Sequence, residues 1–301
     1  MSQELRLRIV FGLILAVVVL AATWFGGIVF NALVVLTGAL VFYEWTAMGR
    51  VRLGAEKSAG SLLPPVGGLP HVAGWVLLFC AALALIAGHF SLAFFAVVIG
   101  ALVLRLVLPD ESAPNWLSAG LLYAGISMVS IAAIRSGGAA GLFATLFVFA
   151  VVWSTDIMAY FVGRSLKGPK LAPSISPGKT WSGALGGCLF AVIAGLLISV
   201  SNGGQPGFGL VVLVVVMSAF SQAGDLFESA LKRMCGVKDS SHLIPGHGGV
   251  MDRVDGLVAA AFLLFLVTLA ARIADPALGS TVGDVLWHWT GIEAPNGVSG
   301  A

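Results

Sequence analysis

Nine long apolar runs constrain the fold of this chain more than any other feature of its sequence. An α-helix needs about 20 such residues to cross the hydrocarbon core of a bilayer. Hydrophobic residues make up 58% of the chain and charged residues 10%, whereas soluble domains carry about 25% charged residues. A β-barrel is excluded because barrel strands alternate between polar and apolar residues. The sequence therefore predicts an all-α, polytopic integral membrane protein.

Polar segments separate the nine runs, and two of them are rich in charge: the loop 163–180 and the segment 232–255. The tail 275–301 is too short and polar to cross the bilayer. Four of its apolar residues share one helical face and predict a short interfacial helix; they are Val282, Val285, Leu286 and Trp289. The predicted spans are 9–25, 28–48, 71–88, 91–108, 117–135, 140–162, 181–201, 208–231 and 256–274.

The basic residues favour one orientation of these spans. With the N-terminus in the cytoplasm, 14 of the 16 Lys and Arg residues fall on the cytoplasmic side, and only Arg135 and Arg272 fall outside. Cytoplasmic loops of membrane proteins carry an excess of Lys and Arg, so this bias supports both the orientation and the number of spans. The two charged loops would then lie together on the cytoplasmic face, where nucleotides are found.

We divide the chain into three regions. Residues 1–140 contain the first five spans, residues 141–274 contain the last four spans with both charged loops, and residues 275–301 form a non-cytoplasmic tail. Ionisable groups crowd in the second region, which we therefore expect to be catalytic. The three cysteines have neither metal-binding nor disulfide spacing, and they are expected to be apolar fillers.

The stretch 221–255 is the part of the chain most dense in ionisable groups, and Asp225 and Asp252 are its sharpest pair. Each lies about one turn from the end of a predicted span, where a carboxylate facing lipid would cost several kcal/mol. Carboxylate oxygens beside a phosphate-binding loop suit Mg²⁺. The alternative is that both are helix-end charges paired with Lys232 or Arg253.

Between these carboxylates, residues 246–249 read Gly-His-Gly-Gly and predict a loop, because glycine costs about 1 kcal/mol inside a helix. The bare backbone N–H groups of Gly248 and Gly249 could meet an anion. His247 could contact a phosphate or take part in proton transfer.

Two further acids lie inside predicted spans. Asp156, in the sixth span, is expected to be functional, because an ionisable residue there is costly unless it serves a site; the alternative is a buried aspartate that ties helices together. Glu44, near the cytoplasmic end of the second span, is expected to be structural.

The loop 163–180 contains Gly178-Lys179-Thr180, which invites comparison with a P-loop. That motif is excluded, because the position that requires its first glycine holds Pro173. The loop retains four cations and the hydroxyls of Ser174 and Ser176, which suit a polyphosphate or a lipid phosphate. The alternative is contact with anionic lipid under the positive-inside rule.

Together these blocks resemble the signature of the phosphatidate cytidylyltransferases, also called CDP-diacylglycerol synthases, over most of residues 30–274. Ser182 departs from the family pattern, since many members carry an acidic or amide residue there. The matching residues are Asp156-x-x-Ala-Tyr160, Ser176-Pro-Gly-Lys-Thr180-Trp, Ser229-Ala-Leu-Lys-Arg233, Lys238-Asp239, Ser241, Ile244-Pro245, His247-Gly-Gly249 and Asp252-Arg-Val-Asp255.

The resemblance implies that CTP and phosphatidic acid react to give CDP-diacylglycerol and pyrophosphate, in phospholipid biosynthesis. It implies an Mg²⁺-dependent enzyme of a bacterial inner membrane, with its active site on the cytoplasmic face. It also implies a two-metal centre, Mg²⁺ with K⁺, held by Asp225 and Asp252. We expect Asp156 and Asp255 to complete the outer shell of the metal or to orient basic groups.

Nucleotidyl transfer depends on positioning and on neutralising phosphate charge, and the basic residues are expected to provide both. Those expected to hold the triphosphate or the leaving pyrophosphate are Lys232, Arg233, Lys238 and Arg253. Those expected to hold the lipid phosphate or cover the site are Lys179, Ser174 and Ser176.

Two other functions are compatible with the sequence. A CTP-dependent kinase of polyprenol or phytol would transfer the γ-phosphoryl group instead. A secondary transporter would use Asp156 and Asp225 as ion sites, but transporters carry paired broken helices in two similar halves, and no such halves are visible. We expect no nucleic-acid partner; the oligomeric state stays open, with a homodimer as one hypothesis.

Overall fold

The computed structural model describes residues 3–52, 68–107 and 113–292 of the chain. Within these residues, seven helices are long and apolar enough to cross a membrane. Two shorter apolar helices, Ile9–Phe25 and Phe90–Leu106, accompany them. These findings confirm the all-α integral membrane class. Part of the predicted polar segment between the second and third spans, including Lys57, lies outside the described residues.

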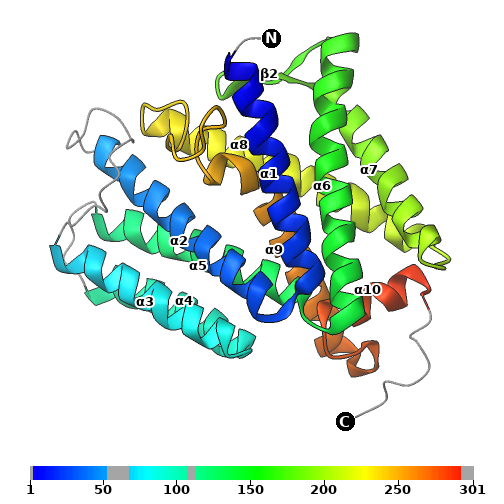
Figure 1. Cartoon of the computed structure of the whole chain (residues 1–301), viewed down its shortest axis with the longest axis horizontal. Helices are drawn as coiled ribbons and strands as arrows, with labels where there is room; N and C mark the ends of the chain where they lie inside the picture. Colours follow the sequence, from blue (N-terminus) through cyan, green and yellow to red (C-terminus); the bar gives the residue numbers. More distant parts are fainter. Residues whose placement is uncertain (1–2, 53–67, 108–112, 293–301) are drawn as a thin grey trace. The chain divides into compact units, whose positions relative to one another are not determined.

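Each of the nine predicted spans falls on one apolar helix (Figure 1). Ser, Asn, Gly and Pro in the connections end the helices close to the predicted limits, within a few residues. The helices are α1 (Gln3–Phe25), α2 (Gly27–Arg52), α3 (Gly68–Ile86), α4 (Phe90–Val107), α5 (Ala113–Arg135), α6 (Gly138–Leu166), α7 (Trp181–Ser201), α8 (Phe208–Met234), α9 (Met251–Ala274) and α10 (Val282–Thr290), with the short 3₁₀ helix η1 (Pro276–Leu278) before α10.

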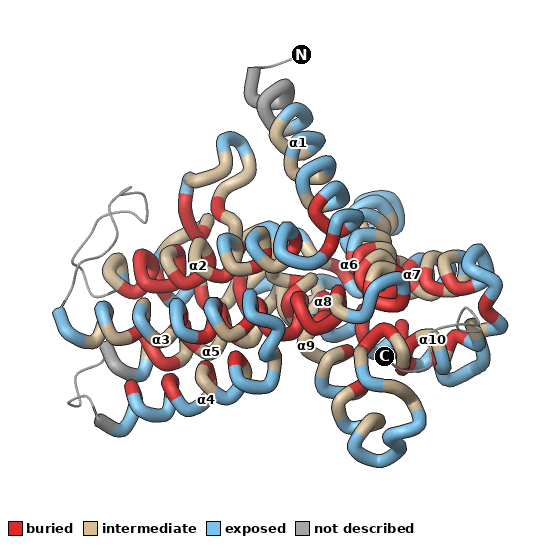
Figure 2. The backbone as a smooth tube through the Cα atoms, turned by 60° about the horizontal axis from the view of Figure 1, so that its bottom comes forward, coloured by how far each residue is buried: buried red, intermediate tan, exposed pale blue. Residues whose placement is uncertain are grey.

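The chain divides into two compact units, and each is described by itself. Unit 1 comprises residues 1–132 and 228–254, so the charged segment after α8 belongs with the N-terminal helices. Unit 2 comprises residues 133–227 and 255–301. In unit 1, α3 and α4 form an antiparallel pair (Figure 1). Exposed and buried residues alternate along both helices, as expected where one face covers a core and the other meets lipid (Figure 2).

A pair of tryptophans fastens α2 to α5 within unit 1. The indole N–H of Trp45 donates to the carbonyl of Trp116 at 2.8 Å, and that of Trp116 donates to the carbonyl of Trp45 at 2.9 Å. Each ring lies over a glycine of the other helix: a Cβ on Gly49 would meet Trp116, and a Cβ on Gly120 would meet Trp45. These contacts hold α2 against α5 at the residue that directly follows the buried Glu44.

Small residues let α6 and α7 pack closely in unit 2. The buried face of α7 repeats a small residue at every fourth position, a pattern common between helices in lipid. A Cβ on Gly183 would lie 2.6 Å from the carbonyl oxygen of Ala159, and one on Gly187 would lie 2.6 Å from that of Thr155. The buried residues of α7 are Gly183, Gly187, Ala191, Gly195 and Ser199.

Helices α8 and α9 also approach closely in unit 2. A Cβ on Gly224 would lie 2.8 Å from the carbonyl oxygen of Asp255, and one on Gly256 would lie 2.6 Å from the hydroxyl of Ser221. Asp225 directly follows Gly224, so this crossing brings it near Asp255, the first residue of α9 that belongs to unit 2.

The loop 163–180 folds as a β-hairpin that sequence reasoning did not predict. Strands β1 (Lys170–Ala172) and β2 (Ser176–Thr180) pair antiparallel. Thr180 ends the hairpin and caps α7, since its hydroxyl accepts the backbone N–H of Gly183 at 3.1 Å. Ser182 donates to the carbonyl of Lys167 and so ties the end of α6 to the start of α7.

The tail forms the predicted short helix, but its apolar face packs on protein. Val282, Val285 and Leu286 are buried, and a Cβ on Gly283 would meet the backbone of Ala140 in α6. Thr281 and Asp284 form a reciprocal capping box at the start of α10.

Candidate functional site

Unit 2 contains a pocket of about 840 Å³ at the end of α6, beside the hairpin. Its volume lies in the range of small-molecule sites, about 300–1,000 Å³. Asp156 and Asp225 both line it, together with the four cations of the loop 163–180, which are Arg164, Lys167, Lys170 and Lys179. Four cations around two carboxylates make the pocket suitable for a phosphate group.

Asp225 forms an ion pair with Lys179 across this pocket. Lys179 Nζ lies 2.5 Å from Asp225 Oδ2, and the two side chains are 25% and 34% exposed. The pair joins α8 to strand β2. Because both side chains are partly open to solvent, a ligand could replace Lys179 as the partner of Asp225, or Asp225 as the partner of Lys179. Sequence reasoning had offered Lys232 or Arg253 as the partner of Asp225 and had placed Lys179 on the lipid phosphate, so this ion pair was not predicted.

The other aspartate of this pocket, Asp156, is an exposed residue of α6. One helical turn later, Tyr160 accepts a 2.7 Å hydrogen bond from Arg164 Nη1 and lies under the same guanidinium. The lining includes Lys179 but neither Ser174 nor Ser176. Ser174 lies in the hairpin turn and Ser176 begins β2, so the pocket does not bring these two predicted ligands to Lys179.

Exposed apolar side chains flank the lining residues along the sequence of α6 and α7, and one of them, Tyr160, lines the pocket itself; we call this set the apolar edge. They come from the end of α6 and the start of α7, the two helices that also supply the pocket's wall. The exposed residues are Tyr160, Phe161, Leu166, Trp181 and Leu185. A phosphate bound in this pocket could therefore carry chains that remain in the bilayer.

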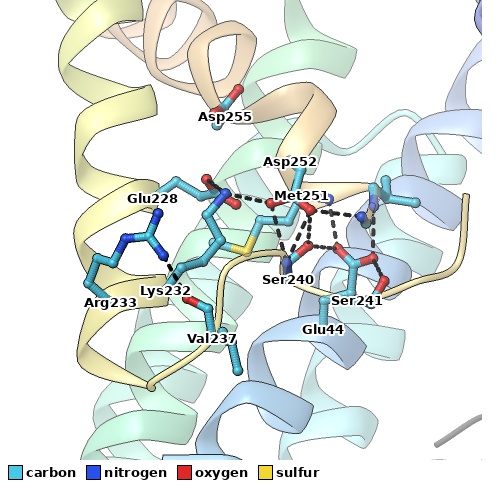
Figure 3. Close-up of polar contacts among 12 residues, drawn as sticks. Glu44, Glu228, Lys232, Arg233, Val237, Ser240, Ser241, Met251, Asp252 and Asp255 are labelled. Atoms are coloured by element: carbon cyan, nitrogen blue, oxygen red, sulfur yellow. Dashed lines mark hydrogen bonds and ion pairs between the residues drawn. The ribbon is translucent and has the colours of Figure 1, made fainter. Parts of the chain in front are cut away.

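Unit 1 contains a second polar centre, built around Asp252 at the start of α9 (Figure 3). Oδ1 accepts from Lys232 Nζ at 2.6 Å. Oδ2 accepts from the backbone N–H of Gly249 at 2.7 Å, the backbone N–H of Ser240 at 3.0 Å and the hydroxyl of Ser240 at 3.1 Å. The side chain is only 5% exposed, so Asp252 organises the segment that surrounds it. Its pairing with Lys232 is the alternative that the sequence left open.

Lys232 also lies 2.6 Å from Glu228 Oε2. Glu228 is fully buried, and neither of its carboxylate oxygens has a hydrogen-bond partner of good geometry among the described residues. Lys232 thus contacts two carboxyl groups, those of Glu228 and Asp252. Sequence reasoning expected Lys232 to bind phosphate, but its ammonium lies on these two carboxyl groups. The neighbouring Arg233 is exposed and donates to the carbonyl of Val237 at 3.3 Å (Figure 3).

Glu44 reaches this centre from α2 and is fully buried. Oε1 accepts from the hydroxyl of Ser241 at 2.6 Å and the N–H of Val250 at 2.8 Å. Oε2 accepts from the N–H of Met251 at 2.7 Å and the hydroxyl of Ser240 at 3.2 Å. The expected structural role of Glu44 is confirmed, because the carboxylate caps the N-terminus of α9.

Two of the glycines between Ile244 and Met251, Gly248 and Gly249, are explained by these two carboxylates. A Cβ on Gly249 would lie 2.0 Å from Ser240 Oγ and 2.5 Å from Glu44 Oε1. Gly248 has φ +80°, and a Cβ there would lie 2.7 Å from Asp252 Oδ2. The loop does approach anions closely, as predicted. In this structure the anions that its backbone meets are carboxylates of the chain itself.

Beside this centre, a pocket of about 580 Å³ opens in unit 1. Its basic side chains are Lys238, His242, His247 and Arg253, with Asp239 as the one acid among the lining residues. The predicted phosphate ligands Lys238, His247 and Arg253 are therefore brought together. Nε2 of His247 also lies about 3.5 Å from the Cβ position of Gly12 on α1.

Asp225 and Asp252 lie in different units, and each offers carboxylate oxygens of the kind that Mg²⁺ takes. Among the described residues, no three His, Cys, Asp or Glu side chains cluster as metal ligands. Mg²⁺ commonly takes only one or two protein carboxylates and completes its shell with phosphate oxygens and water. Asp225, partly exposed in a pocket lined with cations, suits such a ligand. Oδ1 of Asp252 accepts from Lys232 Nζ at 2.6 Å and from the backbone N–H of Ser240 at 3.3 Å, so it would have to exchange the lysine for the metal.

Sequence reasoning assigned the four cations of the loop 163–180 to a phosphate as a group but named only Lys179 as a ligand. It missed that Arg164, Lys167 and Lys170 line the same pocket as Asp156 and Asp225. It also missed the link from Glu44 to the segment 240–251. Glu44 carried a usable signal, an acid inside an apolar span, but no sequence spacing connects it to residues about two hundred positions later.

Comparison with known proteins identifies the chain's relatives. The family model described as "Cytidylyltransferase family" matches residues 6–270. The chain is 42% identical to the phosphatidate cytidylyltransferase of Brucella suis biovar 1 over 280 residues, which are 93% of this chain and 98% of that protein. It is 33% identical to the phosphatidate cytidylyltransferase of Bacillus subtilis over 280 residues, 88% of this chain and 98% of that protein. A shorter match to that of Haemophilus influenzae reaches 52% over 125 residues.

Proposed function

The chain belongs to the cytidylyltransferase family, and we propose that it transfers the cytidylyl group of CTP to phosphatidic acid. A phosphate oxygen of phosphatidic acid attacks the α-phosphorus of CTP. The bond from that phosphorus to the oxygen bridging the α- and β-phosphates breaks, and pyrophosphate leaves with the bonding electrons. The products are CDP-diacylglycerol and pyrophosphate.

The observation that carries this proposal is the composition of the pocket in unit 2. It combines Arg164, Lys167, Lys170 and Lys179 with an exposed apolar edge. A phosphate joined to two acyl chains needs cations for its head and a path to lipid for its tails. We assign the phosphate of phosphatidic acid to this pocket, with Lys179, whose ammonium also pairs with Asp225, as one of its ligands.

The pocket of unit 1 is assigned to the β- and γ-phosphates of CTP and to the leaving pyrophosphate. Lys238, Arg253 and His247 line it, and they would neutralise the charge that develops on the leaving group. Lys232 takes a less direct part than the sequence indicated, because it keeps Asp252 and Glu228 in place.

We propose Asp225 and Asp252 as the protein ligands of Mg²⁺, with Asp156 and Asp255 orienting their surroundings and K⁺ as a second metal. A divalent cation held there would supply positive charge that stabilises the transition state. The chain's own carboxylates hold that charge at the nucleotide, and its basic residues hold the remaining phosphate oxygens.

The proposed setting is a bacterial inner membrane, with all nine apolar helices crossing it and the N-terminus in the cytoplasm. Two of them, Ile9–Phe25 and Phe90–Leu106, are shorter than the other seven; both approach the roughly 20 residues that a span requires. The distribution of Lys and Arg supports this orientation. Both pockets would then face cytoplasmic CTP.

Labelled CTP tests the proposed reaction directly. With purified protein, phosphatidic acid and Mg²⁺, we expect ³²P from [α-³²P]CTP to enter the lipid fraction and ³²P from [γ-³²P]CTP to appear only in pyrophosphate. A CTP-dependent lipid kinase would give the opposite distribution. Transfer of the γ label into lipid would therefore overturn the proposal.

A further inference from the structure

Glu44 holds the segment 240–251 of unit 1 in place. It does so from α2, a helix with no residue among the lining of either pocket. Its carboxylate accepts four hydrogen bonds, two from serine hydroxyls and two from the first backbone N–H groups at α9. The side chain is fully buried. A buried carboxylate is costly unless it is well paired, so these four donors are required for the fold of unit 1 around it.

Ser240 couples Glu44 to Asp252. Its hydroxyl lies 3.2 Å from Glu44 Oε2 and 3.1 Å from Asp252 Oδ2. A hydroxyl has one proton and can donate it to only one carboxylate at a time. Glu44 is thus an alternative acceptor for the Ser240 proton whenever Asp252 engages another positive group.

We propose that Glu44 is a positioning residue for the transfer reaction, acting through the segment 240–251. It fixes both ends of this segment, the serines at one end and the start of α9 at the other. The segment carries His247, which lines the unit 1 pocket, and it leads directly into Asp252. The proposal rests on the proposed function for its catalytic consequence, but the hold on the segment is independent of it.

The test variant is Glu44→Gln, which keeps the shape of the side chain and removes its charge. An amide has one oxygen, so its NH₂ group must face donors such as the N–H groups of Val250 or Met251. Because hydrogen bonds to charged groups contribute more than neutral ones, we expect the segment to loosen. A small misplacement of reacting groups lowers turnover steeply, so we expect kcat to fall about 100-fold. The KM for phosphatidic acid, whose pocket lies in unit 2, should change less than about threefold.

Cys235 provides a readout that does not depend on activity. It lies just before the segment and is 3% exposed, and burial raises the pKa of its thiol, with Arg52 acting weakly in the opposite direction. Replacing Cys80 and Cys188 with serine leaves Cys235 as the only thiol of the chain. In that background, maleimide should react with Cys235 at least about tenfold faster in Glu44→Gln than in the parent, because the thiolate becomes accessible.

Trp45→Phe is the matched control. Trp45 is on the same helix as Glu44, and the change removes its 2.8 Å hydrogen bond to the carbonyl of Trp116 on α5. It therefore weakens the packing of α2 on α5 and leaves the hydrogen bonds of Glu44 to the segment 240–251 in place. We expect a lower apparent Tm, a protected Cys235 and a kcat within about threefold of the parent value, since a neutral hydrogen bond contributes about 1 kcal/mol.

Four outcomes separate the explanations. A fast Cys235 reaction with a low kcat, both specific to Glu44→Gln, supports the proposal. Glu44→Gln with parental kcat and protected Cys235 overturns it, and so does lost activity in Trp45→Phe to the same extent, because α2 packing would then be the cause. A parent that makes no cytidylyl lipid refutes the proposed function, while the Cys235 rates still decide whether Glu44 holds the segment.

Discussion

Replacing Asp225 by asparagine is expected to lower the kcat for CDP-diacylglycerol formation at least about 100-fold, the loss typical of removing one group that stabilises transition-state charge. The neutral amide is a poor ligand for a divalent cation and no longer pairs with Lys179. The side chain is partly exposed in its pocket, so the folded protein should survive the change. The measurement is initial rate with purified protein at saturating CTP, phosphatidic acid and Mg²⁺.

Asp275→Asn is the matched control for this substitution. Asp275 is exposed and its carboxylate caps η1 through the N–H of Ala277 at 3.0 Å, away from both pockets' lining residues. We expect its kcat to stay within about twofold of the parent, as for most surface substitutions. An Asp225→Asn protein with near-parental turnover would remove Asp225 from the reaction.

Replacing Gly249 by alanine is expected to abolish most activity through geometry alone. The added Cβ would lie 2.0 Å from Ser240 Oγ and 2.5 Å from Glu44 Oε1. Both neighbours are held by other hydrogen bonds, so the loop must shift. Overpacking of this kind costs about 1–3 kcal/mol, and a 1 Å displacement near reacting groups lowers turnover about 100-fold. Turnover and the apparent Tm in detergent measure the two effects.

Gly209→Ala is the comparison for Gly249→Ala. Gly209 is an exposed residue of α8 with no atom within 4 Å of its Cβ position. Alanine is favoured over glycine by about 1 kcal/mol in a helix interior, so we expect unchanged turnover and an equal or slightly higher Tm. If Gly249→Ala behaves like Gly209→Ala, the close packing of the loop on Glu44 and Ser240 is not needed for activity.

The helices could be predicted because a long apolar run that crosses a bilayer must adopt an α-helix. Inside lipid every backbone polar group must find a partner within the chain, and an α-helix satisfies this locally. Run length and flanking polar residues therefore fixed the positions of all nine apolar helices to within a few residues. The two β-strands were not predictable in this way, since Pro169, Pro173 and Pro177 read as a stiff loop and the strands together span only eight residues.

The chemical character of the site followed from the sequence, but its internal pairing did not. The positions of Asp225, Asp252, Lys179 and Arg253 are informative because charge is rare in this chain. Which lysine pairs with which carboxylate depends on helix packing. Lys179 was expected on phosphate but pairs with Asp225, and Lys232 pairs with Asp252. Contacts such as Glu44 with Met251 join residues far apart in sequence, and no local pattern encodes them.

The most direct test of the central proposal, that Asp225 and Asp252 hold one divalent cation against CTP, is anomalous scattering from crystals grown with Mn²⁺ and a non-hydrolysable CTP analogue. We expect one Mn²⁺ peak within about 2.5 Å of a carboxylate oxygen from each residue, with the nucleotide's phosphates completing its shell. A nucleotide bound with its Mn²⁺ elsewhere, while Asp225 stays on Lys179 and Asp252 on Lys232, would contradict the proposal.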